Sequence, residues 1–275
     1  MITPIHTLEL AAWDLDAYEF RPERFDREQP ARAREVVARR QPYKGINALC
    51  EEETLLLRDV LERQLSRSDL QAEMLGLDWH LGVVDVRHLL AFQRRLSFNP
   101  TLPALPVPQQ SDWTSLINIA FASLNPVTCD AIHDIVDNTI TLRSGNPNLH
   151  LRVSEDAASL ITVHAGSPFL EIGCYLGRWF LRDGYHRAYA LLRAGIFQLP
   201  AIIVKARTIE ELGAVKPHFF SEAVLLSEQP PFVTDFLDDS LTIEYDRPPT
   251  IKTLHITMEE SIAIATHKEI SGEQL

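Results

Sequence analysis

The chain contains few residues of the kinds that cross-link a fold or hold a metal. Only three of its 275 residues are cysteine. Cys50, Cys129 and Cys174 form neither an even disulfide framework nor a closely spaced pair of ligands, so we interpret them as buried residues or free thiols. The histidines lack the His-x-x-x-His spacing that places two ligands on one helix face. The sequence therefore predicts no metal site built from cysteine or histidine.

Long apolar runs are also missing. No run of about 18 apolar residues is present. The first residues, Met-Ile-Thr-Pro-Ile-His, lack the basic and apolar regions of a signal peptide. We therefore expect a protein that makes no membrane contact and whose default location is cytoplasmic.

Positive charge is scarce relative to negative charge. The 26 Lys and Arg residues are outnumbered by 38 Asp and Glu, which gives a net charge of −12. Sequence-independent binding to nucleic acid depends on clustered Lys and Arg, so we expect no broad binding of this kind. The hydrophobic content of 45% and charged content of 23% are typical of a globular protein.

Two common catalytic motifs do not occur. The sequence has neither the Gly-x-Ser-x-Gly nucleophile motif nor a Walker-type phosphate loop. It also has no internal repeat and no low-complexity tract. The absence of the two motifs excludes the usual hydrolase and P-loop nucleotidase interpretations.

Hydrophobic periodicity predicts an α/β (α+β) protein. We expect an irregular arm over residues 1–40 and one or two amphipathic helices over 47–75. A strand over 79–86 is expected to lead directly into a helix over 86–98. Short helices are expected over 113–124 and 129–138. Further strands are expected over residues 149–153, 159–164, 169–175, 178–181, 200–204 and 251–258.

The most informative stretch runs from Gly177 to Lys205 and indicates a strand, a tight glycine turn, a helix and a second strand. At the turn lies Asp183-Gly184-Tyr185-His186-Arg187, called the elbow below. Glycine lets backbone amides approach a ligand, and a helix N-terminus attracts anions. His and Arg in a first helical turn oppose the helix dipole unless an anion or a carboxylate compensates them. The sequence therefore predicts a phosphate or other anion site at the elbow.

These residues resemble the ParB/sulfiredoxin superfamily. Its members share a strand, a Gly-x-x-Arg turn, a helix and a strand that begins near a proline, as Gly184, Arg187 and Pro200 do here. The Asp-Gly-x-His-Arg form is similar to the branch that includes free-serine kinases. A looser match covers residues 84–95. The resemblance implies a helical N-terminal region over 1–78, a ParB/sulfiredoxin-like mixed-sheet domain over 79–207 with an insertion around 100–165, and a C-terminal extension over 208–275.

The resemblance also implies a ligand. In the superfamily the glycine turn and the following helix contact nucleotide or phosphate groups, so a nucleoside triphosphate or diphosphate, or a phosphorylated small molecule, is expected here with Mg²⁺. Arg187 and His186 are the expected catalytic residues, because cationic groups neutralise developing phosphate charge. The other expected contacts of the ligand are Asp183, Gly184, Tyr185, Gln93 and Arg94.

The sequence differs from members of the superfamily in two ways, and each difference argues against one known function. Sulfiredoxins place their catalytic cysteine where this chain has Tyr185, so sulfinic acid reduction is not expected. The acidic C-terminal region shows no recognition helix of the kind that follows the domain in chromosome-segregation ParB proteins. Centromere binding is therefore not expected either.

Several residues have two interpretations. At the elbow, Arg187 could pair with Asp183, while His186 could cap or pack the turn instead of binding a ligand. The segment Gln93-Arg94-Arg95 could extend a phosphate site or form a solvated face.

Four acidic residues also have two interpretations. Glu171, on a strand near the elbow, could be a catalytic base or an unrelated acid. Asp235, Asp238 and Asp239 could hold Mg²⁺ or form a solvated acidic loop after two prolines.

Three functions follow from these alternatives. The first is a nucleotide-dependent phosphotransferase or hydrolase. The second is a non-catalytic regulatory or DNA-modification-associated module that uses its ligand as a switch, with a homodimer as the partner to test. The third is a nuclease, which the acidic charge disfavours.

Overall fold

The structure is a computed structural model that describes residues 4–13, 28–98, 105–123, 128–145, 149–153, 161–165, 167–215 and 219–259. Helices and strands are mixed throughout, which places the chain in the α+β class, as the sequence predicted. The chain divides into two compact units. One contains residues 1–125 and 166–249, and the other contains residues 126–165 and 250–275. This division runs across the three segments expected from the sequence, and each unit is described separately.

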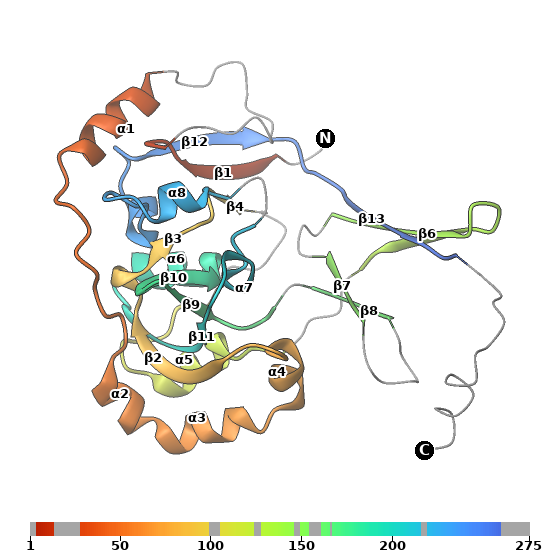
Figure 1. Ribbon diagram of the computed structural model, residues 1–275, viewed down its shortest axis with the longest axis horizontal. Helices are drawn as coiled ribbons and strands as arrows, with labels where there is room; N and C mark the ends of the chain where they lie inside the picture. Colours follow the sequence, from red (N-terminus) through yellow and green to blue (C-terminus); the bar gives the residue numbers. More distant parts are fainter. Residues whose placement is uncertain are drawn as a thin grey trace. The chain divides into compact units, whose positions relative to one another are not determined.

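The larger unit contains a five-stranded mixed sheet with the order β2-β11-β9-β10-β3 (Figure 1). β11 is parallel to β9 and β10 is parallel to β3, whereas the β2/β11 and β9/β10 pairs are antiparallel. The carboxyl ends of β2, β3 and β10 therefore share one edge with the amino ends of β9 and β11. The strands are β2 (Trp79–Asp85), β3 (Leu90–Ala91), β9 (Glu171–Tyr175), β10 (Arg178–Asp183) and β11 (Gln198–Lys205).

The expected strand, glycine turn, helix and strand are all present. β9 and β10 form a hairpin whose two loop residues, Leu176 and Gly177, have positive φ values of 47° and 74°. Such a pair of left-handed residues matches the twist of the flanking strands. β10 leads through Gly184 into α6 (Tyr185–Arg193), which is followed by β11.

Helix α6 has a buried face and a defined end. Tyr185, Ala188, Leu191 and Leu192 are its buried residues, and their spacing of three and four residues forms one apolar stripe. After the helix, Gly195 adopts φ 78°. The Gly195 amide then donates to the Leu192 carbonyl, and the Ile196 amide donates to the Leu191 carbonyl. These two bonds form a Schellman C-cap.

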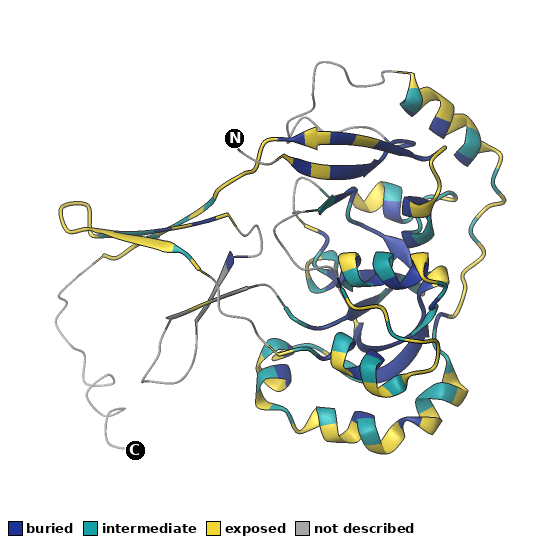
Figure 2. Cartoon of the chain, turned by 180° about the vertical axis from the view of Figure 1, so that it is seen from behind, coloured by how far each residue is buried: buried dark blue, intermediate teal, exposed yellow. Residues whose placement is uncertain are grey.

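Other helices cover the five-stranded sheet and its surroundings. α2 and α3 pack against β2, α5 packs against β11, and α6 packs against η1 and η2. Figure 2 shows that the strands of this sheet are largely buried while the helices expose one side. The elements are α1 (Gln29–Ala38), α2 (Glu51–Leu56), α3 (Arg58–Leu65), α4 (Ser68–Glu73), η1 (Val86–His88), α5 (Trp113–Ala120), α7 (Ile209–Leu212), α8 (Glu222–Leu225) and η2 (Val233–Leu237).

A three-stranded antiparallel sheet corrects the expectation of an irregular N-terminal arm. Its order is β12-β1-β4, with β1 (Ile5–Leu10) between β12 (Thr242–Arg247) and β4 (Arg95–Phe98). The alternation of apolar and polar residues that indicates a strand was hard to recognise here. Thr7 and Glu9, which share one face of β1, are polar and yet fully buried.

The helix expected over residues 86–98 is also wrong. The Asp85 carboxylate accepts a hydrogen bond from the Arg87 amide, 3.0 Å, which fixes only the short 3-10 turn η1. The chain then pairs with β10 through β3 and with β1 through β4. Long-range pairing has therefore overridden a local helical pattern.

The smaller unit contains two antiparallel sheets. One has the order β13-β6-β5, and the other pairs β7 with β8. The helix expected over 129–138 is wrong, because residues 130–134 form β5 and pair with β6. The expected strands near 149–153, 159–164 and 251–258 are confirmed. The strands are β5 (Asp130–Asp134), β6 (Thr139–Ser144), β7 (Leu149–Val153), β8 (Ile161–Ala165) and β13 (Lys252–Thr257).

Candidate functional site

The elbow lies where β10 ends and α6 begins. Gly184 is the N-cap of α6 and has φ +92°, a left-handed conformation that other residues rarely adopt. A Cβ atom at this position would lie 2.6 Å from Leu170 Cδ1. Both the turn and the close approach of the backbone therefore require glycine.

The first turn of α6 leaves amide groups available to an anion. No side chain caps this helix end, and no acidic residue lies in the first turn. The first intrahelical bond joins the Ala188 amide to the Gly184 carbonyl, 2.9 Å. Helix geometry therefore gives the amides of Tyr185, His186 and Arg187 no carbonyl partner within α6, and the positive end of the helix dipole lies at the same place.

Tyr185 connects the elbow to the segment after β3. Its side chain is buried, and its hydroxyl oxygen accepts hydrogen bonds from the amides of Phe92, 2.9 Å, and Gln93, 3.2 Å. Burial raises the pKa of the tyrosine hydroxyl, and the two amide bonds oppose the increase. The hydroxyl thus fixes the backbone of Gln93, a residue that the sequence predicted as a contact of the ligand, beside the elbow.

His186 lies on the outer side of the elbow and is a neutral imidazole near pH 7. Its Nε2 atom is 3.0 Å from the Ser97 carbonyl oxygen, and because a carbonyl only accepts, Nε2 carries the proton. Its ring meets the Phe98 ring edge-on at 5.4 Å between centroids. Burial lowers the pKa of the imidazole, the Ser97 bond opposes this, and Arg187 lowers it further. Nδ1 therefore remains an acceptor.

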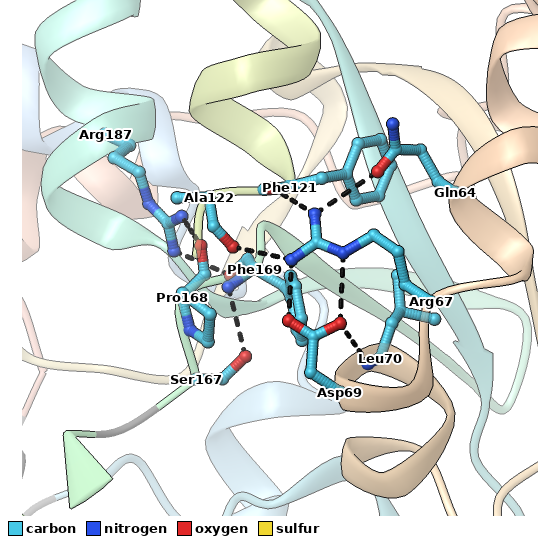
Figure 3. Close-up of polar contacts among 10 residues, drawn as sticks. All are labelled: Gln64, Arg67, Asp69, Leu70, Phe121, Ala122, Ser167, Pro168, Phe169 and Arg187. Carbon is cyan, nitrogen blue, oxygen red and sulfur yellow. Dashed lines mark hydrogen bonds and ion pairs between the residues drawn. The ribbon is translucent and has the colours of Figure 1, made fainter. Parts of the chain in front are cut away.

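Arg187 points into the protein and donates to three backbone carbonyls (Figure 3 shows two of them). Nη1 donates to the carbonyls of Pro168 and Ile119, the latter at 3.2 Å, and Nη2 donates to that of Phe169 at 2.6 Å. The guanidinium thereby joins the end of α5 and the segment before β9 to the elbow. Burial lowers the pKa of this group, while Asp183 and Glu171 oppose the change.

A second arginine supports the same segment from the opposite side (Figure 3). Arg67 donates to the carbonyls of Phe121 and Ala122. Its guanidinium pairs with Asp69 at 2.7 Å and lies 5.3 Å from the centroid of the Phe169 ring. This contact could not be predicted from the sequence, because Arg67 lies in a helical region whose arginines are mostly solvated.

Two carboxylates lie opposite one another beside the elbow. Glu171 at the start of β9 pairs in register with Asp183 at the end of β10. Burial raises the pKa of the Asp183 carboxyl to about 6; the Glu171 carboxylate adds to the increase, and Arg187 opposes it. A strongly shifted pKa with an identified charge partner is typical of acid–base sites.

Glu171 has one oxygen in use and one without a partner. Its side chain is 2% exposed. Oε2 accepts from Arg182 Nη1, whereas the buried Oε1 has no hydrogen-bond partner among the residues that the structure describes. Sequence reasoning missed Arg182, although it directly precedes the elbow, because the register of β10 shifts between Leu181 and Asp183 and simple alternation does not apply there.

The side chains of the other residues that the sequence predicted to contact the ligand lie away from the first turn of α6. Gln93 Nε2 donates to the Arg95 carbonyl. Arg94 is buried with its guanidinium 4.4 Å from the Phe220 ring centroid, and Arg95 pairs with Glu9 at 2.8 Å in the three-stranded sheet. These arginines lie on strand and loop backbone rather than on a solvated helix face.

The acidic residues after Pro231 do not gather into a metal site. Asp235 is buried, and its two oxygens accept from Arg40 at 2.7 and 3.0 Å. Asp238 Oδ1 accepts from the Ser240 amide and hydroxyl. Among the described residues, no group of three or more His, Cys, Asp or Glu side chains is placed to hold a metal ion.

Comparison of the chain with protein-family models, with curated proteins and with solved structures found no match. In the described part of the chain, no helix combines the length and the apolar character needed to cross a membrane. The elbow is therefore interpreted from its own geometry.

Proposed function

We propose that the elbow binds the phosphate group of a nucleotide or of a phosphorylated small molecule, and that the protein transfers or hydrolyses that group. One observation carries the proposal: the uncapped first turn of α6 lies beside a carboxylate pair, the buried Glu171 and the half-buried Asp183. The first feature attracts an anion and the second can accept a proton. Phosphoryl transfer to a hydroxyl or to water requires both.

The amides of the first turn supply the binding step. Three N–H groups that point out of a helix N-terminus, together with its dipole, form a general site for phosphate. Gly184 permits the left-handed turn that presents these N–H groups, and its missing Cβ leaves room for the Leu170 side chain, which would lie 2.6 Å from such an atom. The order β10, Gly184, α6 and β11 also supports our placing this segment with the ParB/sulfiredoxin superfamily.

The carboxylate pair supplies the chemical step. As the attacking oxygen forms its bond to phosphorus and the bond to the leaving phosphate breaks, its proton passes to a carboxylate. Asp183, whose pKa of about 6 lies near neutrality, is suited to exchange that proton. Glu171 keeps an unpartnered buried oxygen. Because Mg²⁺ binds through one or two carboxylates and the phosphates of its substrate, Glu171 is the residue that would hold Mg²⁺ arriving with a nucleotide.

Arg187 has a positioning role in this arrangement. Its guanidinium already donates to the carbonyls of Ile119, Pro168 and Phe169, so it shapes the site without contacting the phosphate directly. His186 offers Nδ1 as an acceptor on the outer side of the turn.

A thermal-shift screen tests the binding step. The protein is heated with ATP, ADP, CTP, GTP or pyrophosphate, with and without Mg²⁺, and a ligand at about 100 times its dissociation constant is expected to stabilise the fold by about 2.7 kcal/mol. The Arg187→Ala variant is expected to lose this stabilisation. No shift with any of the five compounds would contradict the proposal.

Arg178→Ala is the matched control. Arg178 also donates to three backbone carbonyls, those of Leu225, Leu226 and Ser227, but not to any residue of the elbow. We expect this variant to keep the ligand-induced shift. If both variants lose the shift equally, the effect reflects general destabilisation and the elbow is not the site.

A second candidate function is a binding module without turnover. The observation that favours it is that the three hydrogen bonds of Arg187 to carbonyls leave no cation in the described elbow committed to developing phosphate charge. Glu171→Gln distinguishes the two functions. An enzyme is expected to keep binding and lose product formation, whereas a regulatory module shows ligand-dependent dimerisation without product in either form.

A further inference from the structure

A cavity lies at the end of α6 opposite the elbow. It has a volume of about 290 Å³ and lies between η1, the start of α5 and the turn from α6 to β11. Because α6 has 9 residues, its two ends are about 14 Å apart, so this cavity is distinct from the elbow. It is called the Arg87 cavity, and its lining residues are Arg87, Gln110, Ser111, Trp113, Ile196, Phe197 and Gln198.

The Arg87 cavity is lined by polar groups whose hydrogen bonds are incomplete. Arg87 uses Nε and Nη2 for Asp85, which leaves Nη1 without a partner among the described residues. In the same part of the chain, no hydrogen bond engages the side chains of Gln110 and Ser111 or the indole N–H of Trp113. These groups supply both donors and acceptors to a ligand.

Gln198 adds an oriented acceptor. Its Nε2 donates to Glu53 Oε1 at 2.8 Å. The amide group therefore has its nitrogen committed, and its carbonyl oxygen is the atom that remains.

The charge of the cavity favours a neutral ligand. The Arg87 guanidinium and the Asp85 carboxylate form a bidentate pair with a shortest distance of 2.5 Å, so the two charges cancel at close range. The Glu53 carboxylate beside Gln198 adds negative charge. An anion would therefore find no net positive charge among these groups.

The shape and the aromatic residues favour a planar ligand. Arg87 lies 4.3 Å from the centroid of the Phe197 ring, which presents a flat guanidinium–aromatic layer at the cavity. Trp113 lines it as a second aromatic residue. The volume lies at the lower limit of ligand pockets, about 300 Å³, which suits one small ring system rather than a whole nucleotide. Ser111 is held at φ 67°, and such outliers gather at binding sites.

We propose that the Arg87 cavity binds a small, uncharged, planar heterocycle with a hydrogen-bonding edge, of the purine base type. The side-chain amide of Gln110 supplies the donor and the acceptor that match the edge of adenine. The carbonyl oxygen of Gln198 accepts one further hydrogen bond from the ring. The aromatic residues contact its face. This site is independent of the proposed phosphate site.

Nuclear magnetic resonance with adenine as the probe tests the proposal. The indole N–H resonance of Trp113 is assigned from the Trp113→Phe spectrum and followed as adenine is added. We expect it to shift in a saturable way. Gln110→Ala is expected to weaken binding about fivefold to tenfold, as the loss of one hydrogen bond does.

Gln109→Ala is the matched control, because Gln109 is an exposed neighbour that does not line the cavity. We expect wild-type affinity from it, and circular dichroism confirms that both variants fold. Three results would overturn the proposal: an unmoved Trp113 resonance, equal affinity in the Gln109 and Gln110 variants, or binding of the planar anion benzoate in preference to adenine. Because adenine carries no phosphate, failure here leaves the proposed function of the elbow untouched.

Discussion

Two buried glutamates of this protein differ in how completely their oxygens are used. Glu9 in the three-stranded sheet is fully buried, and its Oε1 pairs with Arg95 at 2.8 Å while its Oε2 accepts from Tyr245 at 2.9 Å. Glu171 at the elbow is almost as buried, but within the described ranges of the chain only its Oε2 is engaged, by Arg182. A buried acid with both oxygens bonded stabilises a fold, whereas an unpartnered oxygen is available for a substrate or a cation.

The difference extends to the neighbouring residues. Glu9 has an arginine and a tyrosine hydroxyl directly beside it, and together they engage both of its oxygens. Glu171 lies opposite a second acid, Asp183, whose pKa is raised to about 6. Acids placed opposite one another cost stability, and this cost marks the elbow rather than the three-stranded sheet as the site of function.

The largest expected effect is the loss of unfolding free energy when Glu9, in the three-stranded sheet, is changed. Glu9→Gln removes the charge that pairs with Arg95, which is 6% exposed, and breaking a buried ion pair costs about 3–5 kcal/mol. Urea unfolding measures the loss. Glu244→Gln on the exposed side of β12 is the control and is expected to stay within about 0.5 kcal/mol of wild type. Equal effects of the two changes would contradict a structural role for Glu9.

The next effect concerns the elbow backbone. Gly184→Ala combines a positive φ with a Cβ that would lie 2.6 Å from Leu170 Cδ1, so we expect a loss of about 2–3 kcal/mol in unfolding free energy. Gly45→Ala, where φ is +73° but nothing lies within 4 Å of the Cβ, is expected to cost only about 1 kcal/mol. A smaller loss at Gly184 than at Gly45 would show that the tight turn is not maintained in solution.

Glu171→Gln is expected to cost less than Glu9→Gln. Arg182 is 21% exposed and Asp183 stays nearby to compensate it, so we expect a loss of about 1–2 kcal/mol. Denaturant titration of both variants under the same conditions gives the comparison. A loss as large as that of Glu9→Gln would indicate that Glu171 is structural, and the distinction between the two glutamates would fail.

The smallest effect is a pH dependence. The folded pKa of Asp183 is raised to about 6, so between about pH 4 and pH 6 the folded state binds this proton more tightly than the unfolded state. Stability from this group is therefore lost as pH rises through that range, by about 1 kcal/mol after partial exposure is considered. Asp183→Asn is expected to flatten the slope. An unchanged slope in the variant would assign the effect to another group.

The elbow was predictable because its signals are local. The turn at Gly184, the C-cap at Gly195 and the hairpin at Gly177 each depend on a glycine whose φ is positive, and the strand β11 follows as a continuous apolar run. These features do not depend on distant partners.

Several of the missed features depend on distant partners. β1 was not recognised, because Glu9 is buried against Arg95 and Tyr245, which lie far from it in the sequence. The helix expected after Val86 fails because this segment pairs with β10 and β1. For the same reason the sequence identified Arg187 but not its use, since the three carbonyls it binds lie 18 to 68 positions away in the chain.

The most direct test of the central claim is a titration of the isotope-labelled protein with pyrophosphate, followed through its backbone amide resonances. The account predicts that the amides of Tyr185, His186 and Arg187 shift together and saturate, because they are the free donors of the first turn of α6. Saturable shifts confined to other residues, or no saturable shift at all, would contradict a phosphate site at the elbow.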